Sequence, residues 1–193
     1  MSIEIENLLS VKTRQEWRSW LVANCGTAKF CWILVTRKPS PDTVLYLDAV
    51  EEALCFGWID STGKKGSDTQ SALRFSPRSK KSNWTELNKE RVRRLEKLGM
   101  MTDEGRKCLP NMNIESFAIH PEVMSALKKD KEAYANFIAL PQLYRRIRID
   151  TIQSCLHRNE PELFNGRLKK FIEKPKANKL FGSWHDDGRL LEY

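Results

Sequence analysis

Two nearby segments of this chain contain the residue types that most often carry out chemistry in proteins. The first, "EALCFGWIDS" (residues 52–61), places a thiol, two large aromatic rings and a carboxylate within a few positions. The second, "FSPRSKKSNW" (75–84), adds cations, hydroxyls and a tryptophan. A carboxylate beside an indole can have a raised pKa and act as an acid or base. An arginine can hold a phosphate or carboxylate through two parallel hydrogen bonds.

The candidate acid or base in the first segment is Asp60, two residues after Trp58, so on a strand both side chains would face the same side. Its expected partner is Arg78 in the second segment. Two interpretations stay open: the pair faces a pocket, or it ties a strand to a turn. Cys55 is a poor candidate nucleophile, because the C-terminal end of a helix disfavours a thiolate and no histidine is near in sequence.

The second segment stands just before an expected helix. In "NWTE", Asn83 would cap the first turn and Glu86 would reach back to the Asn83 amide. A helix start offers free amides and partial positive charge to an anion, and Arg78, Lys80 and Lys81 precede it. The alternative is that these cations are only solvated. The predicted ligand-binding residues are Trp58, Asp60, Arg78, Ser82, Asn83, Trp84 and Asn88.

Alternating helices and strands must position these residues. The patterns predict strands over about 29–37, 58–62 and 71–77, and helices over about 14–25, from 42 or 43 to 55, and from 83 to 98. Thr13 is the expected cap of the first helix, and Gly57 ends the second. Glu90 and Arg94 have the spacing of an exposed ion pair on the third.

Beyond residue 112 the pattern is helical throughout. Helix starts are predicted at Pro121, Asp130, Pro141 and Pro161. The expected fold class is α+β, with a small antiparallel sheet and helices followed by a helical module. The expected domains are 1–112 (α+β), 113–180 (helical) and 181–193, a non-helical C-terminal arm that returns onto the body.

The net charge of +8 is concentrated in two segments. Residues 74–107 contain 11 Lys and Arg against 5 Asp and Glu, and residues 141–180 contain 10 against 4. Such segments attract anions, including nucleic acid, although the simpler explanation is a solvated helix face. In the second segment Arg145, Arg146 and Arg148 could lie along phosphates with Tyr144 stacking on a base.

Composition excludes several classes of protein and site. The five cysteines are odd in number and form no CxxC pair, and the three histidines are scattered, so neither a disulfide framework nor a metal site is expected. These features predict a reduced, cytoplasmic protein. No apolar run approaches the roughly 20 residues of a membrane span, and the first residues do not resemble a secretory signal. The common nucleotide, esterase and metalloprotease motifs are missing, and no cofactor is expected.

The segments "EEALCFGWIDS" and "RFSPRSKKSNWTELNKERVRRLEKLGMMTDEG" resemble the signature core of the bacterial YdeI/OmpD-associated, or bacteriocin-protection-like, family. The stretch from about 121 to 180 is similar to that family's helical C-terminal module, although "NGRLKKFIE" replaces its frequent arginine-rich helix. The resemblance implies a link to stress or bacteriocin tolerance and no particular reaction. The signature positions that it implies are Gly57, Trp58, Ile59, Asp60, Phe75, Pro77, Arg78, Ser82, Trp84 and Asn88.

Three functional hypotheses follow. The leading one is a non-enzymatic cytoplasmic protein, not inserted in a membrane, that binds a small anionic ligand between Asp60 and the helix start. The second is an enzyme that uses Asp60 as general acid or base in the same cleft. The third is a nucleic-acid-associated protein that uses the two basic segments.

Overall fold

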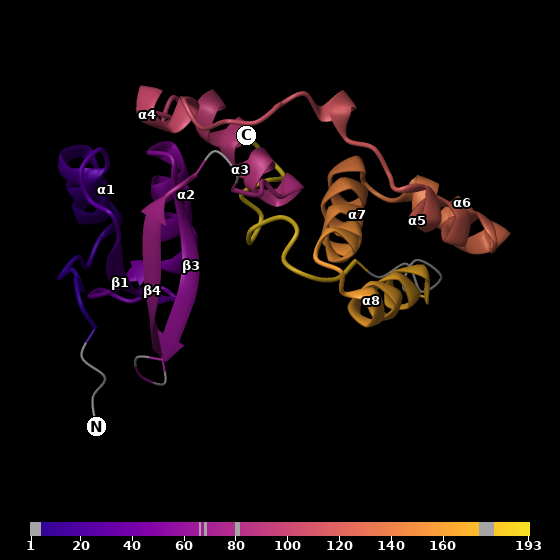
Figure 1. Cartoon of the computed structure of the whole chain (residues 1–193), viewed down its shortest axis with the longest axis horizontal. Coiled ribbons are helices and arrows are strands. Elements are labelled where there is room, and N and C mark those ends of the chain that lie inside the picture. Colours follow the sequence, from indigo (N-terminus) through magenta and orange to yellow (C-terminus); the bar gives the residue numbers. More distant parts are fainter. Residues whose placement is uncertain (1–4, 66, 68, 80–81, 174–179) are drawn as a thin grey trace. The chain divides into compact units, whose positions relative to one another are not determined.

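The computed structural model describes residues 5–65, 67, 69–79, 82–173 and 180–193 (Figure 1). The chain divides into two compact units. Unit 1 comprises Met1–Asn83 and Arg91–Pro110, and unit 2 comprises Trp84–Glu90 and Asn111–Tyr193. The domain boundaries expected at residues 112 and 180 stay predictions.

A four-stranded sheet forms the centre of unit 1, in the order β2-β1-β4-β3. The strands are β1 (Cys31–Thr36), β2 (Val44–Leu45), β3 (Trp58–Lys65) and β4 (Gln70–Pro77). The α+β fold class is confirmed, but the sheet is mixed, because β2 pairs with β1 in parallel while β4 is antiparallel to both of its neighbours. The sequence pattern assigned β2 to the start of a helix, since its two apolar residues are too few to show a strand period.

Helices α1 (Arg14–Asn24), α2 (Tyr46–Cys55) and α4 (Asp103–Arg106) complete unit 1 together with the later part of α3. The Thr13 cap of α1 is confirmed: its hydroxyl accepts the Glu16 amide at 3.1 Å. From α1, Trp17 packs against Phe75 of the sheet, with ring centroids 5.3 Å apart. Gly57 follows α2 in the left-handed region, at φ 72°, and so allows the chain to turn directly into β3.

Helix α3 spans Glu86–Lys97, which corrects the predicted capping box. The Asn88 amide donates to the Thr85 hydroxyl at 3.2 Å, so Thr85 and not Asn83 caps the first turn. Thr85 directly precedes the helix, whereas Asn83 lies two residues further back. The Glu86 side chain is occupied elsewhere, because its Oε2 lies 3.0 Å from Nε of Arg146.

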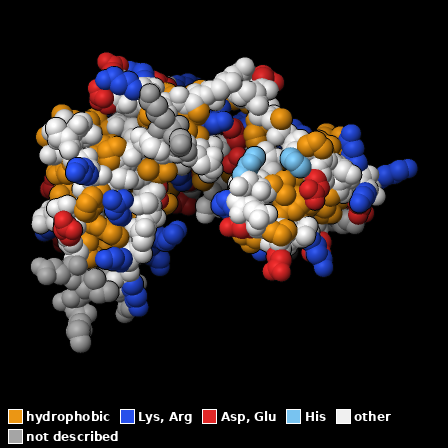
Figure 2. All heavy atoms as spheres, viewed as in Figure 1, with side chains coloured by type: hydrophobic (Ala, Val, Ile, Leu, Met, Phe, Trp, Pro, Cys, Tyr) orange, Lys and Arg blue, Asp and Glu red, His pale blue; other side chains and the backbone are white. Residues whose placement is uncertain are grey.

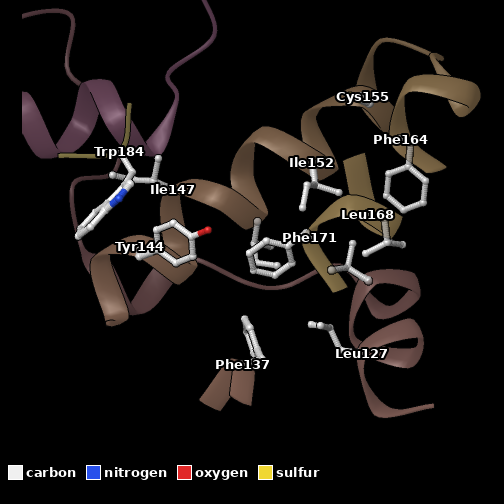
Figure 3. Packing of buried hydrophobic residues seen from close by; sticks show 12 residues of the cluster. Leu127, Phe137, Tyr144, Ile147, Ile152, Cys155, Phe164, Leu168, Phe171 and Trp184 are labelled. Carbon is white, nitrogen blue, oxygen red and sulfur yellow. The ribbon is translucent and has the colours of Figure 1, made fainter. Parts of the chain in front are cut away.

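Unit 2 is helical, and all four predicted helix starts are confirmed. Its elements after α3 are η1 (Ile114–Ser116), α5 (Pro121–Lys128), α6 (Lys131–Ala139), α7 (Gln142–His157) and α8 (Pro161–Glu173). Figure 3 shows the core that they share, in which Phe137, Tyr144 and Phe171 converge from α6, α7 and α8. The final segment has no helix, and its Trp184 packs edge-on against Tyr144, with centroids 5.3 Å apart.

Candidate functional site

Trp58, the first predicted ligand-binding residue, lies in the core of unit 1. Its side chain is 1% exposed, and the indole Nε1–H donates to the carbonyl of Cys25 at 3.2 Å. The ring of Trp20 meets it edge-on, with centroids 5.6 Å apart. The indole therefore presents no exposed face on which a ligand could stack. Two other predicted members, Trp84 and Asn88, belong to unit 2.

Asp60 and Arg78 are brought near one another by the pairing of β3 with β4, in which Trp58 faces Pro77 and Ile59 faces Ser76. Arg78 is 9% exposed. Burial lowers the pKa of Arg78 to about 10, while the Cys108 thiol and the Asp60 carboxylate favour its charged form.

The main-chain amide and one guanidinium nitrogen of Arg78 are bonded to backbone. Its amide donates to the Gly57 carbonyl at 2.8 Å, and Nη1 donates to the Asn83 carbonyl at 3.2 Å. These bonds tie the end of the sheet to the turn that follows. The geometry supports the interpretation of Arg78 as a link between a strand and a turn.

The segment before α3, where an anion site was predicted, lacks the expected helix start at Asn83. The Ser79 amide donates to the Ser82 hydroxyl at 3.0 Å, and the Ser82 amide donates to the Ser79 carbonyl at 3.0 Å. Asn83 is exposed, and the helix begins three residues later at Glu86. The amides of Ser82 and Asn83 are therefore not the start of a helix. Lys80 and Lys81, expected to assist here, lie outside the described residues.

Two buried glutamates form an ion cluster that sequence reasoning did not identify. Glu51 and Glu52, each 1% exposed, lie on α2. Glu52 accepts from Arg14 at 2.7 Å and from Arg18 at 2.6 Å, and Glu51 accepts from Arg94 at 2.9 Å. Buried carboxylates need such partners. The cluster joins α1, α2 and the second half of α3 within unit 1, which is a structural role.

A polar pocket of about 600 Å³ lies in unit 1 at one end of the two central strands of the sheet, where β1 ends and β4 begins. We call it the edge pocket. The antiparallel register that pairs Thr36 with Gln70 brings these two ends together. Its polar lining consists of three cations, Arg37, Lys38 and Lys65, with Thr36, Tyr46, Ser67, Thr69, Gln70 and Ser71. None of the described residues that line it is acidic.

The cations of the edge pocket are exposed. The Arg37 guanidinium lies 5.3 Å from the centroid of the Tyr46 ring, a cation–π distance. Neither Arg37 nor Lys38 forms an ion pair within the part of the chain that the structure describes. Sequence reasoning placed Arg37 at the end of a predicted strand and Lys65 outside the predicted strands. Only the strand register could have shown that they line one pocket.

Many cations of the two basic segments are neutralised internally. In the first segment Arg94 pairs with Glu51, and Arg106 pairs with Glu96 at 2.8 Å. In the second, Arg158 pairs with Glu160 at 2.9 Å. On the face drawn in Figure 2, blue side chains are scattered among orange and red ones. Such pairing leaves less of the formal surplus for a nucleic acid backbone.

The described residues give little support for a reactive thiol or a metal site. Burial raises the pKa of both Cys31 and Cys55 to about 12, so neither thiol is a ready nucleophile at neutral pH. No group of three or more histidine, cysteine, aspartate or glutamate side chains could hold a metal ion in the described ranges. No helix among them is long and apolar enough to cross a membrane.

Two family matches divide the chain. Residues 9–108 match a family described as a domain of unknown function, DUF8412. Residues 116–178 match the family described as Bacteriocin-protection, YdeI or OmpD-Associated, which confirms the resemblance noted for the helical second half. The predicted signature positions from Gly57 to Asn88 fall within the first match. The comparisons found no match among curated proteins or solved structures.

Proposed function

The chain belongs to the DUF8412 family. We propose that it is a non-enzymatic, cytoplasmic protein that binds a small anionic ligand bearing a phosphate or carboxylate group. The name of the family matched by residues 116–178 includes bacteriocin protection. The proposal extends this association with bacteriocin protection to the present chain. Five free cysteines, three of them buried, fit a reducing compartment.

The edge pocket is the observation that carries the proposal. Its volume of about 600 Å³ lies within the range of small-molecule sites, roughly 300–1,000 Å³. Three cations with hydroxyl and amide groups around them suit a phosphate or carboxylate, which accepts hydrogen bonds from all of these donors. The proposal keeps the predicted ligand class and moves the site from the Asp60–Arg78 pair to this pocket.

The enzyme hypothesis has less support. Catalysis by an acid or base needs a titratable group beside the reacting atoms. The described lining of the edge pocket contains no carboxylate, imidazole or thiol; its titratable groups are the three cations and Tyr46. Asp60 faces the side of the sheet that also holds Trp58 and Phe75, by the alternation of the strands.

Binding of inorganic pyrophosphate tests the proposal. Pyrophosphate is expected to raise the melting temperature and to give a saturable calorimetric isotherm. The double variant Arg37→Ala/Lys38→Ala is expected to lose affinity by about tenfold or more, because it removes two of the three cations. A screen of phosphorylated metabolites, nucleotides and carboxylates then ranks ligands.

A matched control separates the pocket from net charge. Lys131→Ala/Lys169→Ala removes the same charge from exposed positions of unit 2 and is expected to bind pyrophosphate like the wild type. An equal loss of pyrophosphate affinity in both double variants would contradict the edge pocket as the binding site. Loss of binding in Arg78→Ala with retention in Arg37→Ala/Lys38→Ala would return the ligand to the Asp60–Arg78 pair. Tighter, steeply salt-dependent binding of an oligonucleotide would favour the nucleic-acid hypothesis.

A further inference from the structure

Unit 2 contains a second pocket of different character, with a volume of about 240 Å³. We call it the helical pocket. Six apolar side chains line it: Ile114, Phe117, Ile119, Met124, Phe137 and Ile138. The polar lining consists of Glu115, Gln142, Arg145 and Arg146. Mostly apolar walls with a few polar groups are typical of small-molecule sites.

The two adjacent arginines of this pocket are in opposite situations. Arg146 is 6% exposed and pairs with both Glu86 and Glu90, so its charge is balanced within unit 2. Arg145 has no ion pair in the described chain. Its guanidinium lies 5.5 Å from the centroid of the Phe137 ring. The buried Nε atoms of both arginines lack a hydrogen-bond partner among the described residues, so the ion pairs are what distinguish them.

A partly buried guanidinium without an ion pair is costly, because its desolvated charge is not compensated within the described chain. A carboxylate is the natural complement, since it can accept two parallel bonds from one arginine. The apolar walls favour a ligand whose remaining atoms are apolar. A 150 Å³ apolar cavity is known to take up benzene, so about 240 Å³ has room for one aromatic ring or a short branched chain.

We propose that the helical pocket binds a small monocarboxylate with an aromatic or short aliphatic body, and that Arg145 holds its carboxylate. Gln142 supplies an amide donor at the same pocket. Glu115 also lines the pocket and disfavours ligands with a second negative charge. This site is separate from the edge pocket and takes a different ligand class, so it does not depend on the function proposed above.

Three probes of nearly equal size test the proposal: benzoate, neutral benzamide and cationic benzylamine. The readout is chemical-shift perturbation in full-length protein, with calorimetry for affinity. Benzoate is expected to bind with a Kd near 1 mM or below and to perturb Phe137 and Ile138. Benzamide is expected to bind about tenfold more weakly, since it loses the charge-assisted bonds. Equal binding of benzamide, or tighter binding of benzylamine, would overturn the role of Arg145.

Variants locate the site. Arg145→Gln is expected to weaken benzoate about tenfold while leaving pyrophosphate binding unchanged, whereas Arg158→Gln, an exposed arginine that ends the same helix, is expected to leave both unchanged. Ile138→Trp fills the pocket from a side chain that is 48% exposed and is expected to weaken benzoate without changing charge. Glu115→Gln is expected to strengthen benzoate binding. Absence of benzoate binding at about 10 mM, or unchanged affinity in both Arg145→Gln and Ile138→Trp, would refute the proposal.

Discussion

The edge pocket and the helical pocket use arginine and lysine in different ways. The edge pocket of unit 1 has about 600 Å³ and three exposed cations. The helical pocket of unit 2 has about 240 Å³, apolar walls and a partly buried Arg145. Exposed cations attract any anion and are screened by salt, whereas a desolvated guanidinium over apolar walls selects for shape as well as charge.

The adjacent residues Arg145 and Arg146 show what decides between a binding role and a structural one. Both line the helical pocket, but only Arg146 has carboxylate partners from α3. A charge balanced by buried partners stabilises the fold, and a charge left without such a partner remains available to a ligand. The same distinction holds in unit 1 between Arg94, which pairs with Glu51, and Arg37 in the edge pocket.

The largest expected effect comes from breaking the buried ion pairs of Arg146 with Glu86 and Glu90. Arg146→Met removes the Arg146 cation from buried Glu90 and leaves Lys89 as an ion-pair partner of Glu86. It should lower the free energy of unfolding by about 3–5 kcal/mol. Arg145→Met should change it by about 1 kcal/mol or less, because it removes only a cation–π contact. Urea unfolding followed by circular dichroism measures both. Similar losses in the two variants would mean that Arg145 is structural as well.

Salt is expected to separate the two pockets by a smaller effect. Raising KCl from about 50 to 500 mM should weaken pyrophosphate at the edge pocket about tenfold, since the Debye length falls below the spacing of exposed charges. Benzoate at the helical pocket should weaken by only about twofold, because its apolar contacts and the buried Nε are shielded from ions. Calorimetric titrations at matched pH give the dependence of each Kd on the KCl concentration. An equal salt dependence of the two ligands would contradict the proposed difference between the exposed cations of the edge pocket and the partly buried Arg145 of the helical pocket.

The smallest expected effect is a pH dependence in unit 2. Burial raises the pKa of Asp150, with the Glu86 charge adding to the increase and a 3.0 Å bond from the Glu86 amide opposing it. The folded state then holds this proton more tightly than the unfolded state does. The stability contributed by Asp150 is therefore present at low pH and is lost as pH rises through the folded pKa, above its ordinary 3.8.

The variant Asp150→Asn tests the expected direction of this change in stability with pH. The variant should gain stability relative to the wild type between pH 4 and pH 7, by about 1 kcal/mol or less. Asp42→Asn, which changes an exposed carboxylate of unit 1, is the matched control. Urea unfolding across this range gives the comparison. A relative loss of stability at pH 7 would show that the hydrogen bond from Glu86 outweighs burial.

Local sequence signals predicted most of the secondary structure. The Thr13 cap, the turn at Gly57 and the helix starts at Pro121 and Pro161 are properties of a few adjacent residues, and the structure confirms them. The start of α3 was wrong because Asn83 and Thr85 are both good caps, and residues far away in sequence determine which one is used. The mixed sheet was missed because a two-residue strand has no period.

The candidate sites depended on tertiary structure. Glu90 and Arg94 have the spacing of an exposed pair, but Glu90 bonds Arg146 and Arg94 bonds Glu51. The sequence by itself determined the α+β class, the helical second half, the family resemblance and a net charge of +8 that is concentrated in two segments. Tertiary structure alone decided which cations have buried partners, because pairing and burial depend on contacts between residues that are distant in sequence.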